Sequence, residues 1–159
     1  MPARAAQALL DRYWDRKLPV DPVAIARAAG ARVVGEALGT LSGKFDVLEG
    51  NSETPGGPVI AFNAFDPPVR QRFTIAHELG HFALRHGPRF RDSTQSFSLS
   101  NYDPIETAAN KFAAELLMPA TVVNGLITGR GISDFNTLAA MFNVSPAAMR
   151  FRLKNLGWL

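Results

Sequence analysis

The sequence predicts an α+β fold, in which a small antiparallel or mixed sheet packs on a helical core and helix-turn-helix-like helices follow at the C-terminus. The expected strands all fall within residues 31–63, whereas helical patterns precede them and fill most of the remaining chain. Hydrophobic residues make up 47% of the 159 residues and charged residues only 19%, which supports a real core and excludes a disordered chain.

The first part of the chain contains signals for two helices and three strands. Apolar residues recur at helical spacing near the N-terminus, and Asp21 followed by Pro22 is typical of a second helix start. Residues 49–58 are rich in Gly, Pro, Ser and Asn, which predicts a hairpin loop. The expected helices are residues 3–17 and 22–29, and the expected strands are residues 31–34, 41–47 and 59–63.

The rest of the chain indicates helices separated by proline-containing turns. Asp103 and Ser145 each precede a proline, which pairs a capping side chain with the residue best suited to the first helical position. Residues 89–101 are polar and have no period, so we expect a long loop there. The expected helices are residues 69–84, 104–117, 120–128, 133–142 and 146–156.

Composition also limits the chemistry. The chain has no cysteine, which excludes disulfides and thiolate metal sites and is compatible with the cytoplasm, the location that we expect. The net charge of +3 is too small to indicate nucleic-acid binding by itself. No apolar run approaches the roughly 18 residues that span a bilayer, so no membrane partner is expected. We interpret the first ten residues as mature helix rather than a signal peptide.

The most informative motif is His77-Glu78-Leu79-Gly80-His81, which lies within a helical pattern. Residues four apart lie on one face of a helix, so His77 and His81 are expected to bind one metal ion. Glu78 is rotated from them by about 100° and can act as general base on a water molecule, whose pKa zinc lowers to about 7. The alternative is a helix that carries two histidines by chance.

A third protein ligand is expected, because catalytic zinc usually has three. We favour Glu106, with Asn110 on the same helical face holding one of the two histidines in the required tautomer. The alternatives are an acid that interacts with the helix dipole and a solvated amide. Glu115 lies on a different face and is expected to be a surface charge or a salt-bridge partner.

Other residues have secondary roles in this hypothesis. His86 is expected to cap its helix, and either it or Tyr102 is a candidate donor to the developing oxyanion. Gly80 is expected to allow close packing against the metal helix. We further expect the strand at residues 59–63 to bind an extended substrate by strand addition, and the loop at residues 89–101 to gate the site.

Two segments carry a family resemblance. Residues 72–81, RFTIAHELGH, resemble the zinc motif of the ImmA/IrrE family of metallopeptidases. Residues 106–119, ETAANKFAAELLMP, resemble the second signature of that family, and the strand that ends at Asn63 and the pattern at residues 138–145 also fit. The resemblance covers nearly the whole chain and is far more specific than His-Glu-x-x-His alone.

The resemblance implies a gluzincin-like zinc endopeptidase in which Glu106 is the third ligand. It implies a protein substrate, typically a DNA-binding transcriptional repressor that is cut to release stress or mobile-element genes. The chain departs from the pattern at Ala108, where many members carry a second Glu. This position is therefore no ligand here. His and Glu ligands suit Zn2+, although manganese or iron ligation uses the same donors.

The C-terminal residues favour a second hypothesis. Residues 135–156 resemble a helix-turn-helix, and Arg150, Arg152 and Lys154 lie on its second helix, where they would contact DNA. Because these helices are rich in apolar residues, we favour the interpretation that they pack on the peptidase core. The expected domains are residues 1–128, the metallopeptidase domain, and residues 129–159, the appended helices. A third hypothesis is a protein-binding regulator with a purely structural zinc site, against which Glu78 argues.

Overall fold

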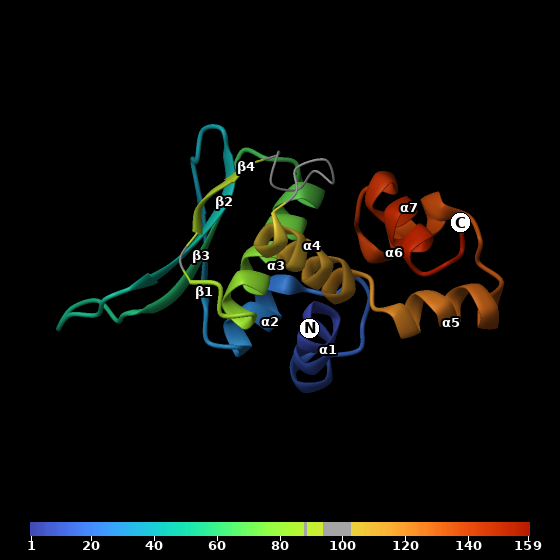
Figure 1. Ribbon diagram of the computed structural model, residues 1–159, viewed down its shortest axis with the longest axis horizontal. Helices are drawn as coiled ribbons and strands as arrows, with labels where there is room; N and C mark the ends of the chain where they lie inside the picture. The colour runs from blue at the N-terminus through green and yellow to red at the C-terminus, as the bar shows by residue number, and fades with distance from the viewer. Residues whose placement is uncertain (88, 94–102) are drawn as a thin grey trace.

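The computed structural model describes residues 1–87, 89–93 and 103–159 and shows the expected α+β architecture (Figure 1). The helices are α1 (Pro2–Tyr13), α2 (Pro22–Ala28), α3 (Pro68–Ala83), α4 (Pro104–Leu117), α5 (Ala120–Arg130), α6 (Phe135–Phe142) and α7 (Pro146–Asn155). The strands are β1 (Arg32–Glu36), β2 (Leu41–Leu48), β3 (Gly57–Asn63) and β4 (Arg89–Ser93). In Figure 1, α3 and α4 lie between the sheet and the C-terminal helices.

Helix starts agree with the local signals in the sequence. Asp21, Asp103 and Ser145 each accept a backbone N–H at the start of a helix and precede a proline, as predicted. The first helix is shorter than predicted, because it ends at Tyr13 and Trp14 has an extended backbone. The indole of Trp14 donates to the carbonyl of Lys17, so these last residues form a turn instead of helix.

The sheet is mixed and has the order β1-β3-β2-β4. β3 pairs with β1 in parallel and with β2 in antiparallel orientation. Both edges of β3 are therefore occupied, which contradicts the prediction that residues 59–63 bind a substrate by strand addition. A central strand has no free backbone donors and acceptors along its edges.

The segment after the metal helix differs from the prediction. Residues 89–93 form β4, which pairs antiparallel with β2, whereas we expected residues 89–101 to be a loop throughout. The segment has no strand-like apolar pattern, and its pairing depends on the edge that β2 offers. Residues 94–101, and with them the predicted gating, lie outside the described residues.

Helix α3 is the structural centre of the molecule. Eight consecutive residues, from Thr74 to His81, are buried, because α3 packs against β2 and β3 on one side and against α4 on the other. Gly80 lies at the contact with α4, where an added Cβ would be 3.1 Å from the Phe112 ring. This confirms that Gly80 permits close packing, and the approach of the two helices offsets its low helix propensity.

Buried hydrogen bonds join the C-terminal helices to the rest of the molecule. Arg152 on α7 donates to Glu115 Oε1 at 2.8 Å and to the carbonyl of Met118 at 2.9 Å. The other oxygen of Glu115 accepts the backbone N–H of Ala120 at 3.0 Å. Glu115 is thus a buried salt-bridge partner at the junction of α4 and α5, and not a surface charge.

Arg72 makes a second connection, from α3 to the end of α6. Its guanidinium donates to the carbonyls of Asn143 at 3.0 Å, Phe142 at 3.2 Å and Val20 at 2.8 Å. Burial lowers the pKa of Arg72, and the charge of Asp21 opposes that shift. The arginine that begins the metal-motif segment therefore also holds the last helices in place.

The predicted division of the chain between residues 128 and 129 falls inside α5, and the division itself stays a prediction. Leu138, Phe142 and Met149 of the last two helices belong to the same buried cluster as the core of α3 and α4. No single helix in the described part of the chain is long and apolar enough to cross a membrane. Helices α4 and α5 meet that test only as a pair, and the pair is bent by 44°.

Candidate metal centre

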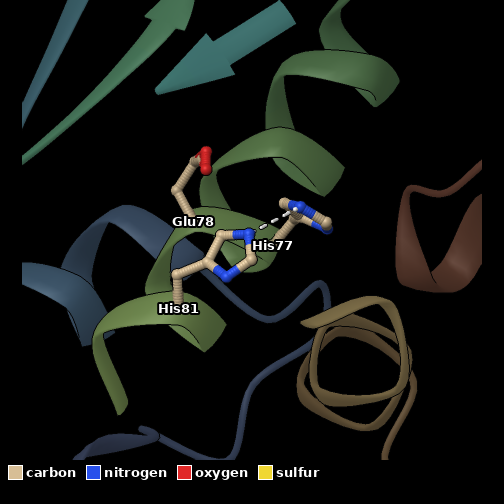
Figure 2. A group of neighbouring side chains, drawn as sticks. All are labelled: His77, Glu78 and His81. Carbon is tan, nitrogen blue, oxygen red and sulfur yellow. Dashed lines mark hydrogen bonds between the residues drawn. The ribbon is translucent and has the colours of Figure 1, made fainter. Parts of the chain in front are cut away.

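The two histidines of the motif lie one turn apart on α3, with their rings toward each other (Figure 2). The Nε2 atoms of His77 and His81 are 3.1 Å apart, and the rings meet edge to face at 88°. Both side chains are 0% exposed. The helical spacing therefore brings two imidazole nitrogens to one point, as the motif predicts.

Glu106 reaches the same point from α4. Its Oε2 atom lies 2.8 Å from His77 Nε2 and 3.2 Å from His81 Nε2. The ligand atoms of a tetrahedral zinc ion, each about 2.0–2.1 Å from the metal, lie roughly 3.3 Å apart. The distances between the three atoms are close to this value. Two imidazoles and one carboxylate are also a donor set typical of catalytic zinc. The residues present therefore fit a metal ion.

Asn110 contacts the outer nitrogen of a motif histidine, as predicted, and that histidine is His77. Its Oδ1 atom is 2.8 Å from His77 Nδ1, on the far side of the ring from Glu106. An amide oxygen accepts a hydrogen bond, so Nδ1 of His77 is the donor in this contact, and Nε2 is the ring nitrogen that faces Glu106. Glu106 and Asn110 are four residues apart on α4, which explains how one helical face serves both nitrogens of the ring.

His86 contacts the outer nitrogen of His81, a contact that the prediction of a capping role misses. The Nδ1 atoms of the two residues are 2.8 Å apart. His86 follows the end of α3, and sequence spacing alone does not show that the chain turns back toward the ring. The signal that the sequence offers is a third histidine five residues after His81, which marks His86 as a candidate without giving its direction.

Glu78 lies on another side of α3, toward the strands (Figure 2). One of its oxygens lies within 4.8 Å of a ring nitrogen of each histidine. Its side chain is 0% exposed. A carboxylate in this place is close enough to act on a water molecule at the metal position, while Glu106 Oε2 contacts the Nε2 atoms of both histidines.

Comparisons with known proteins agree with this arrangement. A family model described as the IrrE N-terminal-like domain, of the peptidase M78 family, matches residues 26–154. The chain belongs to this metallopeptidase family. The match begins within α2 and ends within α7, and it therefore includes every residue of the candidate metal centre.

Two relatives are proteins named radiation response metalloprotease IrrE. The one from Deinococcus radiodurans is 32% identical over 123 residues, which cover 73% of this chain and 34% of the relative. The one from Deinococcus deserti is 34% identical over 106 residues, which cover 62% of this chain and 37% of the relative. The chain thus spans about a third of the length of these curated relatives.

Three other positions that the sequence singled out do not contribute to the metal centre in the described part of the chain. Ala108 lies on α4 and has no donor atom, so the second acid found in many family members has no counterpart at this position. Tyr102, a candidate oxyanion donor, lies outside the described residues. Arg152, predicted as a DNA contact, is buried against Glu115 and is therefore not available to a phosphate.

Gly43 on β2 gives the first mutational prediction. A Cβ at this position would lie 2.3 Å from Thr74 Cγ2, 3.1 Å from the carbonyl of Ala61 and 3.4 Å from Glu78 Cγ. Gly43→Ala is expected to lower the free energy of unfolding by about 1–3 kcal/mol, because the added methyl group overpacks the contact between β2 and α3. Chemical denaturation measures this change.

Gly125→Ala on α5 is the matched control, because an added Cβ there has nothing within 4 Å among the atoms considered. That substitution is expected to stabilise the protein by up to about 1 kcal/mol through helix propensity. If both variants unfold at the same denaturant concentration, the close approach of β2 to α3 is not as described.

Proposed function

We propose that the chain is a zinc-dependent endopeptidase that hydrolyses a peptide bond in a protein substrate. The observation that carries this proposal is the triangle formed by His77 Nε2, His81 Nε2 and Glu106 Oε2, with edges of 2.8, 3.1 and 3.2 Å. Glu78 beside it supplies the proton-transfer group. Membership of a metallopeptidase family and relatives named metalloproteases support the proposal.

In this proposal His77, His81 and Glu106 hold the metal, and Asn110 orients His77. Zinc supplies Lewis acidity, which makes water acidic near neutral pH and polarises a carbonyl oxygen. The burial of the ligand side chains limits competing water and strengthens electrostatic interactions within the site. Helix α3 packs against α4, which keeps the donor atoms of the two helices together.

Glu78 is the general base in the proposed reaction. Its carboxylate accepts a proton from the attacking water and then donates that proton to the leaving amine nitrogen. One residue therefore serves both steps. Its place next to the ligand histidine, rotated by about 100° around the helix, lets it reach the reacting water while Glu106 provides the carboxylate ligand.

We further propose that the substrate is a helix-turn-helix transcriptional repressor. The resemblance to the ImmA/IrrE family supports this choice, and the name of the Deinococcus relatives connects those proteins with a radiation response. Cleavage of a repressor would release its target genes. The activity is expected in the cytoplasm, where repressor and DNA meet.

The test incubates the zinc-loaded protein with the repressor encoded beside its gene, or with host lysate if no such repressor exists. Glu78→Gln runs in parallel, and mass spectrometry identifies the products. A defined cut that the wild type makes and the variant does not make would support the proposal. Identical product patterns for the two proteins would contradict it.

A second candidate function is direct DNA binding through α7. Arg150 and Lys154 are exposed, and Phe151 between them is 48% exposed, which leaves a basic and aromatic strip on the helix. The burial of Arg152 removes one of the three expected cations. Binding through this strip would weaken steeply with salt and with Arg150→Glu. The peptidase proposal requires neither effect.

Metal removal tests the proposed site by a route independent of activity. A ligand that binds only the folded state stabilises it by about 4 kcal/mol at a thousandfold excess over its Kd. Chelation of zinc is therefore expected to lower the Tm, and added zinc to restore it, as measured by calorimetry. Glu78→Gln should keep this response, whereas Glu106→Ala should lose most of it.

The size of the stability change on chelation also distinguishes a catalytic zinc site from a purely structural one. The large hydrophobic core joins all the helices of the described part of the chain without the metal residues, so the zinc-free protein is expected to remain folded at room temperature. Complete unfolding on chelation would instead favour the hypothesis of a purely structural zinc site. A Tm unaffected by zinc would contradict the metal centre.

A further inference from the structure

His86 contacts the candidate metal centre without belonging to the triangle of donor atoms. Its Nδ1 atom lies 2.8 Å from His81 Nδ1, and the ring centroids are 5.1 Å apart with an angle of 62° between the planes. His81 directs its other nitrogen, Nε2, at His77 and Glu106. His86 therefore lies behind His81, on the side of the ring away from the metal position.

The end of α3 is shaped to bring His86 there. The backbone N–H of His86 donates to the carbonyl of His81 at 2.9 Å, which closes a turn one residue wider than a helical turn. Arg85 between them adopts a left-handed conformation, with φ of 60°. Glycine is the usual residue at such a helix end, because a side chain is strained there. The strained turn returns His86 to the ring of His81.

Proton positions follow from the proposed metal site. His81 can bind a metal through Nε2 only if that atom has a free lone pair, so its ring proton is then on Nδ1. The Nδ1–H of His81 points at His86 Nδ1, which must accept. His86 consequently carries its own proton on Nε2. Each of the two ligand histidines thus has a hydrogen-bond acceptor at its Nδ1 atom. The acceptor is Asn110 Oδ1 for His77 and His86 Nδ1 for His81.

We propose that His86 is a positioning residue that holds His81 in the tautomer and orientation required for metal binding. The proposal rests on the proposed zinc site. Loss of an outer hydrogen-bond partner of a metal-bound histidine typically lowers metal affinity by about 10- to 100-fold. His86 is only half-buried, so a packing role alone would leave the affinity almost unchanged.

Three substitutions of His86 in the whole 159-residue chain distinguish these roles. His86→Leu removes the acceptor, and His86→Asn keeps an acceptor oxygen at the place of Nδ1. His86→Gln moves the acceptor to the place of Nε2. Competition with a chromophoric chelator measures the zinc Kd of each variant, and thermal unfolding of the zinc-free proteins compares their folds.

We expect His86→Leu to raise the zinc Kd by about 10- to 100-fold. His86→Asn should recover most of this loss and His86→Gln should not. Equal affinities for the wild type and His86→Leu would overturn the proposal, as would equal losses for all three variants. A wild type that does not bind one zinc ion per chain would instead overturn the metal site itself, so the two failures are distinguishable.

A second test uses only the wild-type protein and does not depend on the folding of any variant. Long-range proton–nitrogen NMR correlations of the zinc-loaded protein report which ring nitrogen of each histidine carries the proton. We expect the proton on Nδ1 of His81 and on Nε2 of His86. A proton on Nδ1 of His86 would overturn the proposal, because two protonated nitrogens cannot share the 2.8 Å contact.

Discussion

Glu78→Gln is expected to lower the rate of peptide cleavage by about 10²- to 10⁴-fold and to leave zinc binding intact. Glutamine has nearly the same shape as glutamate, so the buried space beside α3 remains filled. The amide cannot accept a proton from the attacking water, and the reaction loses its general base. The rate of product formation from the cleaved protein, measured together with the zinc content, tests this expectation.

Glu106→Gln is the matched control, because it makes the same chemical change at the carboxylate assigned to the metal. This variant is expected to lose both zinc affinity and cleavage, since a neutral amide is a weak zinc ligand. If Glu78→Gln lost zinc and Glu106→Gln kept it, the roles of the two acids would have to be exchanged. Full activity of Glu78→Gln would rule out Glu78 as the base.

Arg152→Ala is expected to lower the free energy of unfolding by about 3–5 kcal/mol. Arg152 and Glu115 are only 8% and 7% exposed, and their contact is 2.8 Å. Removal of the guanidinium leaves the Glu115 carboxylate buried without its charged partner. The substitution also removes the hydrogen bond to the Met118 carbonyl, at the junction between α4 and α5. Urea denaturation of the zinc-free protein measures the change.

Two further variants show whether loss of the pair between Arg152 and Glu115 causes the loss of stability. Arg150→Ala alters an exposed arginine on the same helix and is expected to change stability by less than about 0.5 kcal/mol. The double variant Arg152→Met with Glu115→Leu should recover much of the loss, because a buried pair can be replaced by apolar side chains of similar volume. Equal stabilities for Arg150→Ala and Arg152→Ala would contradict the buried pair.

Features that depend on neighbours along the chain could be predicted from the sequence. The caps at Asp21, Asp103 and Ser145 act within one turn, and their helices begin where predicted. The meeting of His77 and His81 follows from helical spacing in the same way. The contact of Asn110 with a ligand histidine could be predicted as well, because a metal histidine needs an acceptor for its second nitrogen.

Other features depend on which distant segments meet, and only the tertiary structure decided them. The β4 strand exists because β2 offers an edge, and β3 is unavailable to a substrate because β1 and β2 flank it. The sequence showed Arg152 as one of three cations on a helix, although it is buried against an acid 37 positions away. The left-handed Arg85 turns His86 onto His81, a direction that residue spacing does not encode. Local geometry is set by a few adjacent backbone angles, whereas burial and long-range pairing depend on how the whole chain packs.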